Sequence, residues 1–513
     1  MNKIKKALIS ISDKKNIEPL LKCLQKFNIE IISSGNTSKE IKKLGYKSKE
    51  ISEYTEFPEI LSGRVKTIHP KVYAGILSRR NLKSDKNDLN NFNINTIDLV
   101  IVNFYPFEKI LNLKNIHSKI IENIDIGGPT LVRAGAKNYK DVTVITNSNQ
   151  YDELIKEIIK YNGSTSLNFR RKMAECAFME TGYYDALIAE YFNNLSNNKY
   201  PIKKIIHAKL IDNLRYGENP HQDGAIYSKT FDTKIKQLWG KKLSYNNYND
   251  LFSALSISKS FPKNIGTVIV KHTNPCGVSI NKDKVKSYKL ALSSDPISAF
   301  GGIISFNFKI NKKLALELNK IFLEVIVCNG IENSALKILN KKKNLRIVDA
   351  SNFKLEKTQN ISSIMNSILI QSHDNINFSS KNFKVVSKKK PTSKELKSLI
   401  FAFNVCRFVK SNSIVIVKND STIGIGSGQS SRLDSCEIAI KKINKFQKIF
   451  KGDWIVAASD AFFPFVDGVE KLVQSGVKAI IQPSGSIRDK EIIKYANKTG
   501  TVLVFSKTRH FKH

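Results

Sequence analysis

Residues 6–38 read KALISISDKKNIEPLLKCLQKFNIEIISSGNTS and hold two short apolar runs on either side of an amphipathic stretch. KALISIS (6–12) and IEIISSG (29–35) have the length and β-branched content of buried strands, whereas Ile17–Phe27 repeats apolar residues at helical spacing. A further strand pattern follows at TIDLVIVNFYPF (96–107). This alternation of strand and helix predicts an α/β domain with a parallel sheet covered by helices.

The alternating pattern ends in one long helical stretch, from about Ser166 to Leu195. The polar segment SNNKYPIKK (196–204) follows it and is the best candidate for a linker. Beyond the linker the pattern changes to mixed strands and helices, and two strand-and-turn runs look alike without establishing a repeat. We therefore expect two domains, residues 1–197 and 198–513.

The composition limits the classes of protein to which this chain can belong. The 513-residue chain has a formal net charge of +38, but its lysines are spread along the chain without a clustered arm, an RRM-type aromatic signature or zinc-finger spacing. We therefore expect attraction of phosphorylated substrates and no specific nucleic acid. Six cysteines without a CxxC pair favour a reducing cytoplasm, and no apolar stretch approaches the roughly 18 residues of a membrane span.

Polar residues of the first part collect where strands end. In SSGNT, the residues Ser34, Gly35 and Thr37 stand between a strand and a helix, so hydroxyls and free backbone N–H groups converge at the positive end of the helix dipole. This turn is a candidate phosphate site, although serine before a helix is more often a plain N-cap.

Two further loops of the first part offer anion-binding groups. ENIDIGGPTLVRAGAKN (122–138) places paired glycines before a helix, and GRVKTIHPKV (63–72) is a basic loop for which solvation is the ordinary explanation. The candidate anion-binding residues of these loops are Gly127, Gly128, Arg64, Lys66 and Thr67.

In the second part, Lys271 and His272 end the buried-looking strand TVIVKH (267–272). An apolar surround can shift the pKa values of such a pair and suit it to proton transfer. A lone histidine would more often be structural, but the adjacent lysine and the following Asn-Pro and Cys-Gly pairs favour catalysis.

Ordered motifs along the whole chain resemble those of the bifunctional purine-biosynthesis family that joins phosphoribosylaminoimidazolecarboxamide formyltransferase to IMP cyclohydrolase. They run through SISDK, SSGNT, GRVKTIHP, NFYPF, IDIGG, AKN, RYGENPHQ, KHTNPCG, SNS, IGSGQSSR, SDAFFPF, PSGS and RHFKH. The resemblance implies an N-terminal methylglyoxal-synthase-like cyclohydrolase domain and a C-terminal transformylase of two cytidine-deaminase-like subdomains. It also implies 10-formyltetrahydrofolate as cosubstrate, no required metal, and a homodimer whose transformylase sites use both chains.

The substrates so implied are aminoimidazole carboxamide ribotide (AICAR) and its formylated product (FAICAR). For formyl transfer, the resemblance implies that His272 takes or relays the amine proton, that Lys271 stabilises charge on the formyl oxygen, and that Asn412 positions the carboxamide. The implied binding residues are Arg215, Tyr216, Arg432 and Arg509 for the ribotide and Phe462 and Asp467 for the folate, with Glu324 as a further substrate contact.

For ring closure, the resemblance implies Lys66, Tyr105, Asp125 and Lys137, whose individual roles stay open, with the turn from Ser34 to Thr37 as phosphate site. A lysine, an acid and a phenol can supply the oxyanion contact and the proton transfers without a cofactor.

The chain departs from the family pattern at several positions. Asn36 stands where a second glycine is common, and asparagine tolerates the positive φ such a turn can need. Gly135 replaces an alanine at a cost of about 1 kcal/mol if it lies in a helix. The other departures are Cys328 and Asn329 for an Ala-Pro pair and Ser427 for an alanine.

Two other classes compete with this interpretation. A zinc nucleobase deaminase would share the second domain's fold, but Asn274 stands where its glutamate should be and no second cysteine follows Cys276 at the required spacing. A nonenzymatic nucleic-acid-binding protein is supported by the charge alone.

Overall fold

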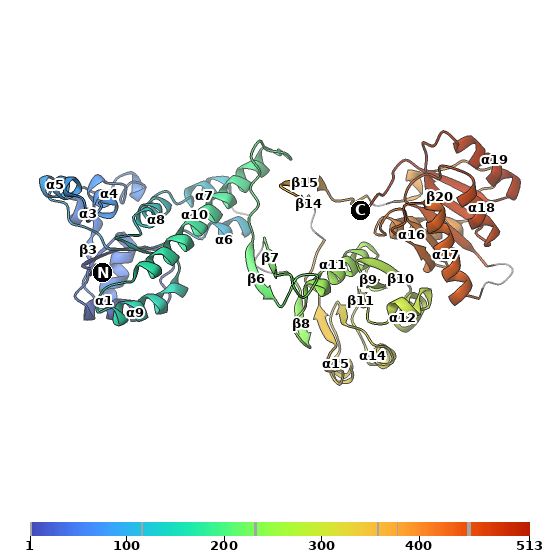
Figure 1. Ribbon diagram of the computed structural model, residues 1–513, viewed down its shortest axis with the longest axis horizontal. Coiled ribbons are helices and arrows are strands. Elements are labelled where there is room, and N and C mark those ends of the chain that lie inside the picture. The colour runs from blue at the N-terminus through green and yellow to red at the C-terminus, as the bar shows by residue number, and fades with distance from the viewer. Residues whose placement is uncertain (1–2, 114–115, 230–232, 356–358, 377, 449–452) are drawn as a thin grey trace. The chain divides into compact units, whose positions relative to one another are not determined.

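The chain divides into two compact units, described by a computed structural model that covers residues 3–113, 116–229, 233–355, 359–376, 378–448 and 453–513 (Figure 1). Unit 1 is Met1–Ala208 and unit 2 is Lys209–His513. The division falls after Ala208 rather than after residue 197, because His207 is tied to helix α10 (Leu167–Leu195). Its Nε2 lies 2.5 Å from Glu190 Oε2, and its ring packs edge-on against Tyr183.

Unit 1 is built on a five-stranded sheet in the order β3-β2-β1-β4-β5, in which every neighbouring pair is parallel. The predicted parallel sheet is therefore confirmed. The strands are β1 (Lys6–Ile11), β2 (Glu30–Ser33), β3 (Lys49–Glu50), β4 (Leu99–Asn103) and β5 (Thr143–Ile145). The order reverses between β1 and β4, and open α/β sheets bind ligands at the carboxyl ends of the strands beside such a reversal.

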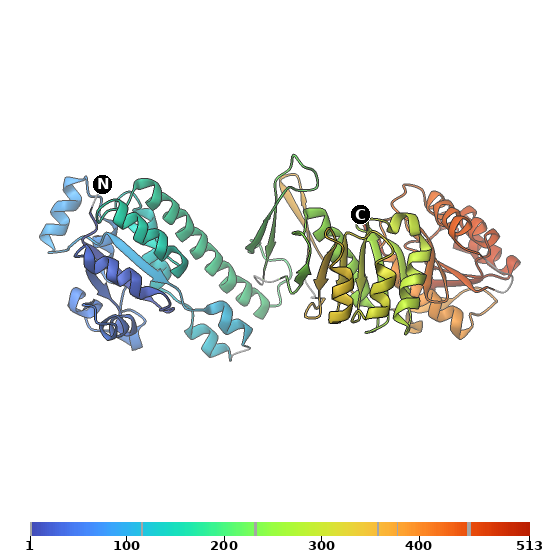
Figure 2. The same cartoon turned by 90° about the horizontal axis from the view of Figure 1, so that it is seen from below.

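The helices of unit 1 lie on this sheet and around it. They are α1 (Ile17–Lys26), α2 (Gly35–Lys43), α3 (Ile51–Thr55), α4 (Pro70–Leu77), α5 (Lys83–Asn91), α6 (Phe107–Asn112), α7 (His117–Glu122), α8 (Gly127–Lys137), α9 (Tyr151–Lys160) and α10. In α1, the buried Leu20, Leu21 and Leu24 lie on one face, as helical periodicity predicts. The long α10 packs along α8 and β5 (Figure 2).

Unit 2 is built on a 12-stranded mixed sheet whose two halves repeat one topology. The strands of the first half are β8 (Lys236–Trp239), β9 (Gly266–Lys271), β10 (Asn274–Ile280), β11 (Ile303–Phe306), β12 (Val325–Cys328) and β13 (Arg346–Asp349). Those of the second are β16 (Phe383–Val385), β17 (Ile414–Lys418), β18 (Ser421–Gly426), β19 (Ile455–Ser459), β20 (Ala479–Pro483) and β21 (Val502–Ser506).

The orders β10-β9-β11-β12-β13-β8 and β18-β17-β19-β20-β21-β16 match strand for strand, with the same parallel and antiparallel pairings. The helices match as well: α11 (Tyr245–Ser260) with α16 (Ser393–Cys406), α12 (Lys284–Ser294) with α17 (Arg432–Phe446), α14 (Lys312–Leu318) with α18 (Asp467–Gln474), and α15 (Asn333–Leu339) with α19 (Asp489–Thr499). The structure thus establishes the repeat that one sequence could not, and the two like subdomains expected from the resemblance are present.

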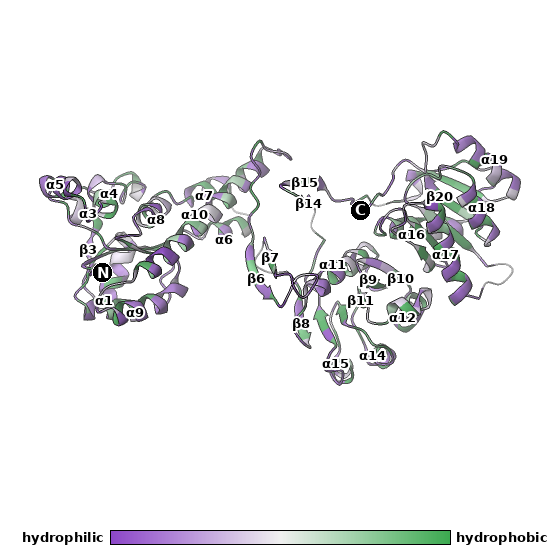
Figure 3. Ribbon diagram, in the orientation of Figure 1, coloured by the Kyte–Doolittle hydropathy of each residue, from purple (hydrophilic) through white to green (hydrophobic). Residues whose placement is uncertain are grey.

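The two halves join where β10 and β18 pair antiparallel, with Ser279 opposite Ser421. Helices approach this central pair closely, because a Cβ on Gly277 or Gly426 would lie 1.9 Å from a backbone oxygen of α12 or α17. Figure 3 shows hydrophobic strands inside unit 2 and hydrophilic residues along α17 and α19, as expected for a sheet covered by helices.

Shorter elements complete unit 2. Two antiparallel hairpins stand apart from the large sheet, one of β6 (Lys209–Leu214) and β7 (Gly224–Ser228), the other of β14 (Gln359–Ile364) and β15 (Ser367–Ser372). The short helix α13 (Pro296–Ala299) precedes β11. Within the described ranges, no helix of either unit has the length and apolar character that crossing a membrane requires.

Candidate active sites

Lys271 and His272 lie at the tight turn between β9 and β10. His272 and Thr273 both have positive φ, 53° and 62°. The carboxylate of Asp250 in α11 accepts their two backbone N–H groups, at 3.0 Å from His272 and 2.5 Å from Thr273. Lys271 Nζ donates to the carbonyl of Phe300 at 2.9 Å. The turn therefore places Lys271 and His272 at one edge of the sheet.

Two asparagines in the first turns of α11 bond to segments that carry further predicted residues. Asn247 Nδ2 donates to Glu324 Oε2 at 2.7 Å, and Asn246 Nδ2 donates to the Glu218 carbonyl at 3.1 Å. Glu218 follows Arg215 and Tyr216, whose side chains stack with the guanidinium carbon 4.7 Å from the ring centroid. Glu324 is thus bonded directly to the helix that also holds the His272 turn, whereas Arg215 and Tyr216 precede the bonded residue Glu218 by three and two positions.

The second half brings Asn412 to this edge. Asn412 precedes β17, and its Nδ2 donates to the carbonyls of Gln429 and Ser430, each at 2.9 Å. The neighbouring Lys410 donates its backbone N–H to Asn274 Oδ1 at 3.0 Å, two residues after His272. One hydrogen bond therefore joins the His272 turn of the first half to the Asn412 loop of the second.

Arg432 is the buried cation behind Asn412. Its Nη2 donates to Asn412 Oδ1 at 2.6 Å, and its Nη1 contacts the Asp460 carboxylate and donates to Ser459 Oγ at 2.8 Å. Asp460 is fully buried and also accepts from Ser411 Oγ at 2.6 Å. The guanidinium thus fixes the amide of Asn412 while its own charge is balanced.

A cavity of about 430 Å³ opens beside Asn412. Five of the predicted residues line it: Asn412, Arg432, Phe462, Asp467 and Arg509. Arg509 reaches it because the chain terminus is anchored. The buried His510 donates its backbone N–H to the Asp460 carbonyl at 2.8 Å, and its Nδ1 contacts the Asp374 carboxylate.

In unit 1, Asp125 lies in the turn before α8. Its Oδ1 accepts from the Gly128 backbone N–H at 2.8 Å, and its own N–H donates to the Tyr184 hydroxyl at 2.8 Å. Burial raises the pKa of Asp125, although the backbone of Gly128 and Tyr105 and the charge of Lys66 oppose the shift. Burial, followed by the Asp125 charge, raises the pKa of Tyr105. Asp125, Tyr105 and Lys66 therefore interact electrostatically within one site.

The paired glycines of this turn have no room for a side chain. A Cβ on Gly127 would lie 2.5 Å from Thr67 Oγ1, and one on Gly128 would lie 2.6 Å from Asp125 Oδ2. The glycines therefore let the loop that carries Thr67 pack directly against the amino end of α8.

The SSGNT turn lies at the carboxyl end of β2. Ser34 makes no side-chain cap to α2, so it is not the plain N-cap that its position favoured. Its hydroxyl instead pairs with Ser10 Oγ at 3.0 Å, and Thr37 Oγ1 bonds both backbone groups of Ile11 at 3.1 Å. These contacts fix the turn against β1 and leave the amino end of α2 uncapped by a serine.

Arg64 and Lys137 lie differently from the other predicted residues. Arg64 is paired with Glu122 on the surface. Lys137 is the last residue of α8, whose first residue is Gly127, so about 15 Å of helix separates it from the Asp125 turn. A single unit 1 therefore does not bring Lys137 to Asp125.

Four acidic or polar groups of these sites were not among the predicted residues, although Asn103 and Asp460 stand in the motifs NFYPF and SDAFFPF. Glu59 has Oε1 3.5 Å from the Cβ position of Gly35, and Asn103 Oδ1 accepts from Ser12 N at 2.6 Å. The other two are Asp250 and Asp460, described above. Each acts through contacts between segments distant in sequence, which no local motif reveals.

The departures from the family pattern are structurally mild. Asn36 lies inside α2, and the positive φ of 26° belongs to Gly35, so Asn36 needs no tolerance of positive φ. Gly135 lies inside α8, where the predicted cost applies. Cys328 ends β12, at the opposite end of that strand from Glu324, and is fully buried.

The residues that resemble a zinc deaminase motif are committed to other contacts. Asn274 accepts from Lys410, as above, and burial raises the pKa of the Cys276 thiol to about 12, so it stays protonated at neutral pH. Among the residues that the structure describes, no three His, Cys, Asp or Glu side chains gather to hold a metal ion.

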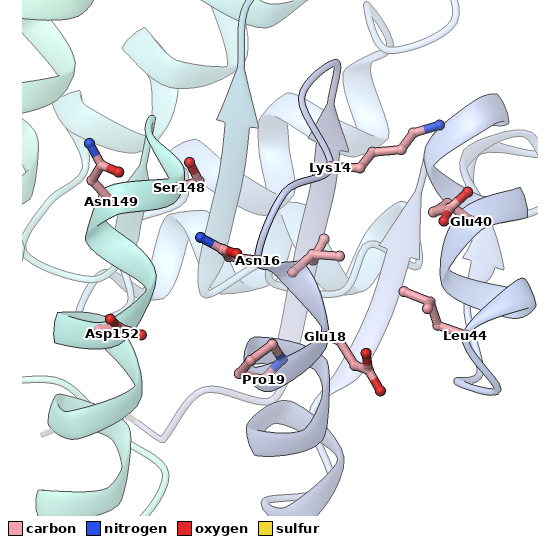
Figure 4. Close-up of a pocket in the computed structure, with 10 residues that line it drawn as sticks. Lys14, Asn16, Glu18, Pro19, Glu40, Leu44, Ser148, Asn149 and Asp152 are labelled. Carbon is pink, nitrogen blue, oxygen red and sulfur yellow. The ribbon is translucent and has the colours of Figure 1, made fainter.

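A separate cavity of about 670 Å³ lies beside the amino end of α1 (Figure 4). Figure 4 shows Lys14 extended toward the helix that carries Glu40, with Asp152 on the other side. Its lining includes none of the predicted cyclohydrolase residues, so it is distinct from the Asp125 site.

Together these features define an α/β enzyme of two units. One has glycine- and serine-containing turns at the end of a parallel sheet, and the other has a polar site at one edge of a duplicated sheet. Residues 135–442 match the family described as AICARFT/IMPCHase bienzyme, and residues 16–130 match the MGS-like domain. The first match covers more than half of the chain, so the chain belongs to the AICARFT/IMPCHase bienzyme family. The resemblance found in the motifs is confirmed, and with it a bifunctional enzyme of purine biosynthesis.

Relatives match over their whole length. The bifunctional purine biosynthesis protein PurH of Persephonella marina is 45% identical, across 99% of this chain and 100% of its own. Those of Acetivibrio thermocellus and Aquifex aeolicus are 44% and 41% identical over the same shares. A crystal structure of ForH is 31% identical and covers 37% of this chain and 99% of its own, but its TM-score of 0.33 is too low to inform the fold.

Proposed function

We propose that unit 2 transfers a formyl group from 10-formyltetrahydrofolate to the 5-amino group of AICAR, and that unit 1 closes the product, FAICAR, into IMP. Membership of the bienzyme family supports both activities. The observation that carries the assignment to unit 2 is the hydrogen bond between Asn274 and Lys410, which joins the segments that carry His272 and Asn412 in different halves of the repeat.

Formyl transfer needs help because the amine's lone pair is delocalised into the ring and carboxamide. The amine nitrogen attacks the formyl carbon, the tetrahedral intermediate loses the amine proton, and the bond to folate N10 breaks as N10 gains a proton. His272 is placed to take or relay the amine proton, and Lys271 to stabilise charge on the formyl oxygen. Asn412, held by Arg432, orients the carboxamide beside them.

The binding residues divide between the two substrates. Guanidinium groups suit phosphate and carboxamide oxygens, and an aromatic face with a carboxylate suits a pterin. Arg215, Tyr216, Glu324, Arg432 and Arg509 are assigned to the ribotide, and Phe462 and Asp467 to a folate-type cosubstrate. Neither reaction needs a metal in this scheme.

Ring closure takes place at the Asp125 site of unit 1. The carboxamide nitrogen attacks the formyl carbon, and the formyl oxygen leaves as water after protonation. Asp125, whose pKa burial raises, is suited to donate a proton, while Lys66 and Tyr105 contact the developing oxyanion. The ribotide phosphate is assigned to the Ser34–Thr37 turn, with Arg64, Thr67, Gly127 and Gly128 around the substrate.

We assign Lys137 to the cyclohydrolase site of a second copy, in a cytoplasmic homodimer, because α8 holds it about 15 Å from the Asp125 turn of its own chain. Lys66→Ala and Lys137→Ala variants are each expected to lose cyclisation. When they are mixed and re-associated, half of the dimers are hybrid and one of the two sites in each hybrid is intact, so about a quarter of the activity returns. No recovery in hybrids would contradict the shared site.

The full chain tests the two activities when AICAR and 10-formyltetrahydrofolate are supplied and tetrahydrofolate and IMP are followed separately. Both products are expected. His272→Ala is expected to abolish tetrahydrofolate formation yet still cyclise supplied FAICAR, and Lys66→Ala to do the reverse. If either folded variant lost both activities, the division between units 1 and 2 would be wrong.

A further inference from the structure

We propose that Asp250 is a positioning residue for formyl transfer, holding the His272 turn in its reactive conformation without touching substrate. The inference rests on the proposed function of unit 2, since it concerns how that site is held together. It starts from the backbone of the turn rather than from any side chain of the cavity.

The turn adopts a conformation that its residues disfavour. His272 and Thr273 are consecutive residues with φ of 53° and 62°. L-residues other than glycine seldom occupy this left-handed region, and a β-branched residue such as threonine is among the least suited to it. The turn therefore needs a compensating contact from outside its own sequence.

Asp250 supplies that contact. One carboxylate oxygen accepts the His272 N–H at 3.0 Å, and the other accepts the Thr273 N–H at 2.5 Å. Bonds to an ionised acceptor are stronger than neutral ones. Asp250 is itself fixed, because Leu251 and Leu255 of the same helix are fully buried in the core. Both amides of the strained turn are thus bound to a rigid helix.

The matching turn of the second half is built differently. Between β17 and β18 it is Asn419 and Asp420, with φ of 51° and 58°, and both residue types tolerate this conformation. There the carboxylate is on the turn, and Asp420 hydrogen-bonds to Ser398 of α16. The same fold therefore forms this turn without a helix carboxylate, and only the half that carries His272 uses one.

The backbone is also what directs the imidazole. Within the described part of the chain, no hydrogen bond holds the His272 side chain, and the turn that Asp250 binds sets the Cα–Cβ bond from which the imidazole projects. Displacement of a catalytic group by about 1 Å can lower a rate by about 10²-fold.

Asp250→Ala in the full chain tests this. We expect kcat for formyl transfer to fall by about 10²-fold while KM for AICAR and 10-formyltetrahydrofolate changes by less than about threefold. Cyclisation of supplied FAICAR should stay at the wild-type rate. Adding Thr273→Gly to Asp250→Ala should restore kcat by about tenfold or more, because glycine adopts positive φ freely. A merely structural loss would not be rescued in this way.

The matched control is Asp283→Asn, at a position outside the site. The Asp283 carboxylate accepts the Lys286 backbone N–H at 2.9 Å, and its replacement should leave formyl transfer unchanged. If Asp250→Ala does not fold, Asp250→Asn, which keeps one acceptor oxygen, carries the same rescue test. Full activity in Asp250→Ala, or a loss that Thr273→Gly does not relieve, overturns the inference. Formyl transfer by His272→Ala would instead overturn the proposed role of His272 itself.

Discussion

Replacing Arg432 with lysine separates the shape of the guanidinium from its charge. Arg432 is 8% exposed. Its Nη1 contacts the Asp460 carboxylate and donates to Ser459 Oγ at 2.8 Å, and its Nη2 donates to Asn412 Oδ1 at 2.6 Å. An ammonium group is a single point on a flexible stem. If it reaches Asp460, it leaves Asn412 without its donor.

The magnitude follows from the bonds that are lost. A hydrogen bond from a charged donor contributes about 1.5–3 kcal/mol, so Arg432→Lys should lower the free energy of unfolding of unit 2 by about 2–3 kcal/mol. The charge of Asp460 stays paired, which avoids the roughly 3–5 kcal/mol expected of Arg432→Met. Asn412 keeps its own donations but loses its fixed oxygen, so kcat for formyl transfer should fall by about 10²-fold.

The chain offers a clean assay for the stability of unit 2. Its two tryptophans, Trp239 and Trp454, both lie there, so tryptophan fluorescence during denaturant unfolding reports unit 2 alone. Arg407→Lys is the matched control. Arg407 is also 8% exposed and donates to the Ile376 carbonyl at 2.8 Å, outside the cavity lining. It should lose stability yet keep most of its formyl transfer.

Two results would refute this reasoning. If Arg432→Lys unfolded at the wild-type denaturant concentration with an unchanged kcat, the planar guanidinium shape of Arg432 would contribute neither to stability nor to formyl transfer. If Arg432→Lys and Arg407→Lys lost formyl transfer equally, the loss would follow from destabilisation and not from release of Asn412.

Three further outcomes are expected. Gly127→Ala should lower cyclisation of FAICAR by more than about tenfold and spare formyl transfer, because its Cβ would lie 2.5 Å from Thr67 Oγ1; separate assays of IMP and tetrahydrofolate check this. Gly135→Ala should raise the free energy of unfolding of unit 1 by about 1 kcal/mol, measured by calorimetry, since it lies inside α8 and its Cβ would meet Val144 at an ordinary 3.4 Å. Burial lowers the pKa of Lys512 to about 8, so the unfolded chain binds more protons between about pH 8 and 10.4 and the stability of unit 2 should rise with pH across that window. Lys512→Met should remove this rise in tryptophan-monitored unfolding at about pH 7.5 and 9.5.

Much of the fold could be predicted because local sequence patterns indicate its strands and helices. Apolar runs such as KALISIS and the helical spacing of Ile17–Phe27 predict the strands and helices of unit 1. The repeat in unit 2 could not be recognised, because its equivalent positions hold different residues, as His272 and Asn419 do. Only the matching strand order makes the relation visible.

The candidate sites were predictable where they follow a strand and unpredictable where an acid reaches them from elsewhere. Lys271, His272 and Asn412 stand in turns that carry recognisable motifs. Asp250 lies in no quoted motif, and although Asp460 lies in SDAFFPF, nothing in that motif indicates its buried contact with Arg432. An aspartate in a helix or after a strand is ordinary until its partners are known. Their roles depend on tertiary distances, which sequence spacing does not encode.

The duplicated sheet explains why the site has residues from both halves at a single edge. Since β10 and β18 run antiparallel, the end of β9 meets the start of β17 at one edge, and the Asn419–Asp420 turn lies beside Ile280 at the other. The repeat alone would make the two edges equivalent. The edge with the Asn419–Asp420 turn, whose residues tolerate positive φ, holds none of the predicted site residues. The edge with His272 has a turn whose residues disfavour positive φ and whose backbone is bound by Asp250. Local preference is thus violated where catalysis is proposed, as expected when function and not stability selects the residue.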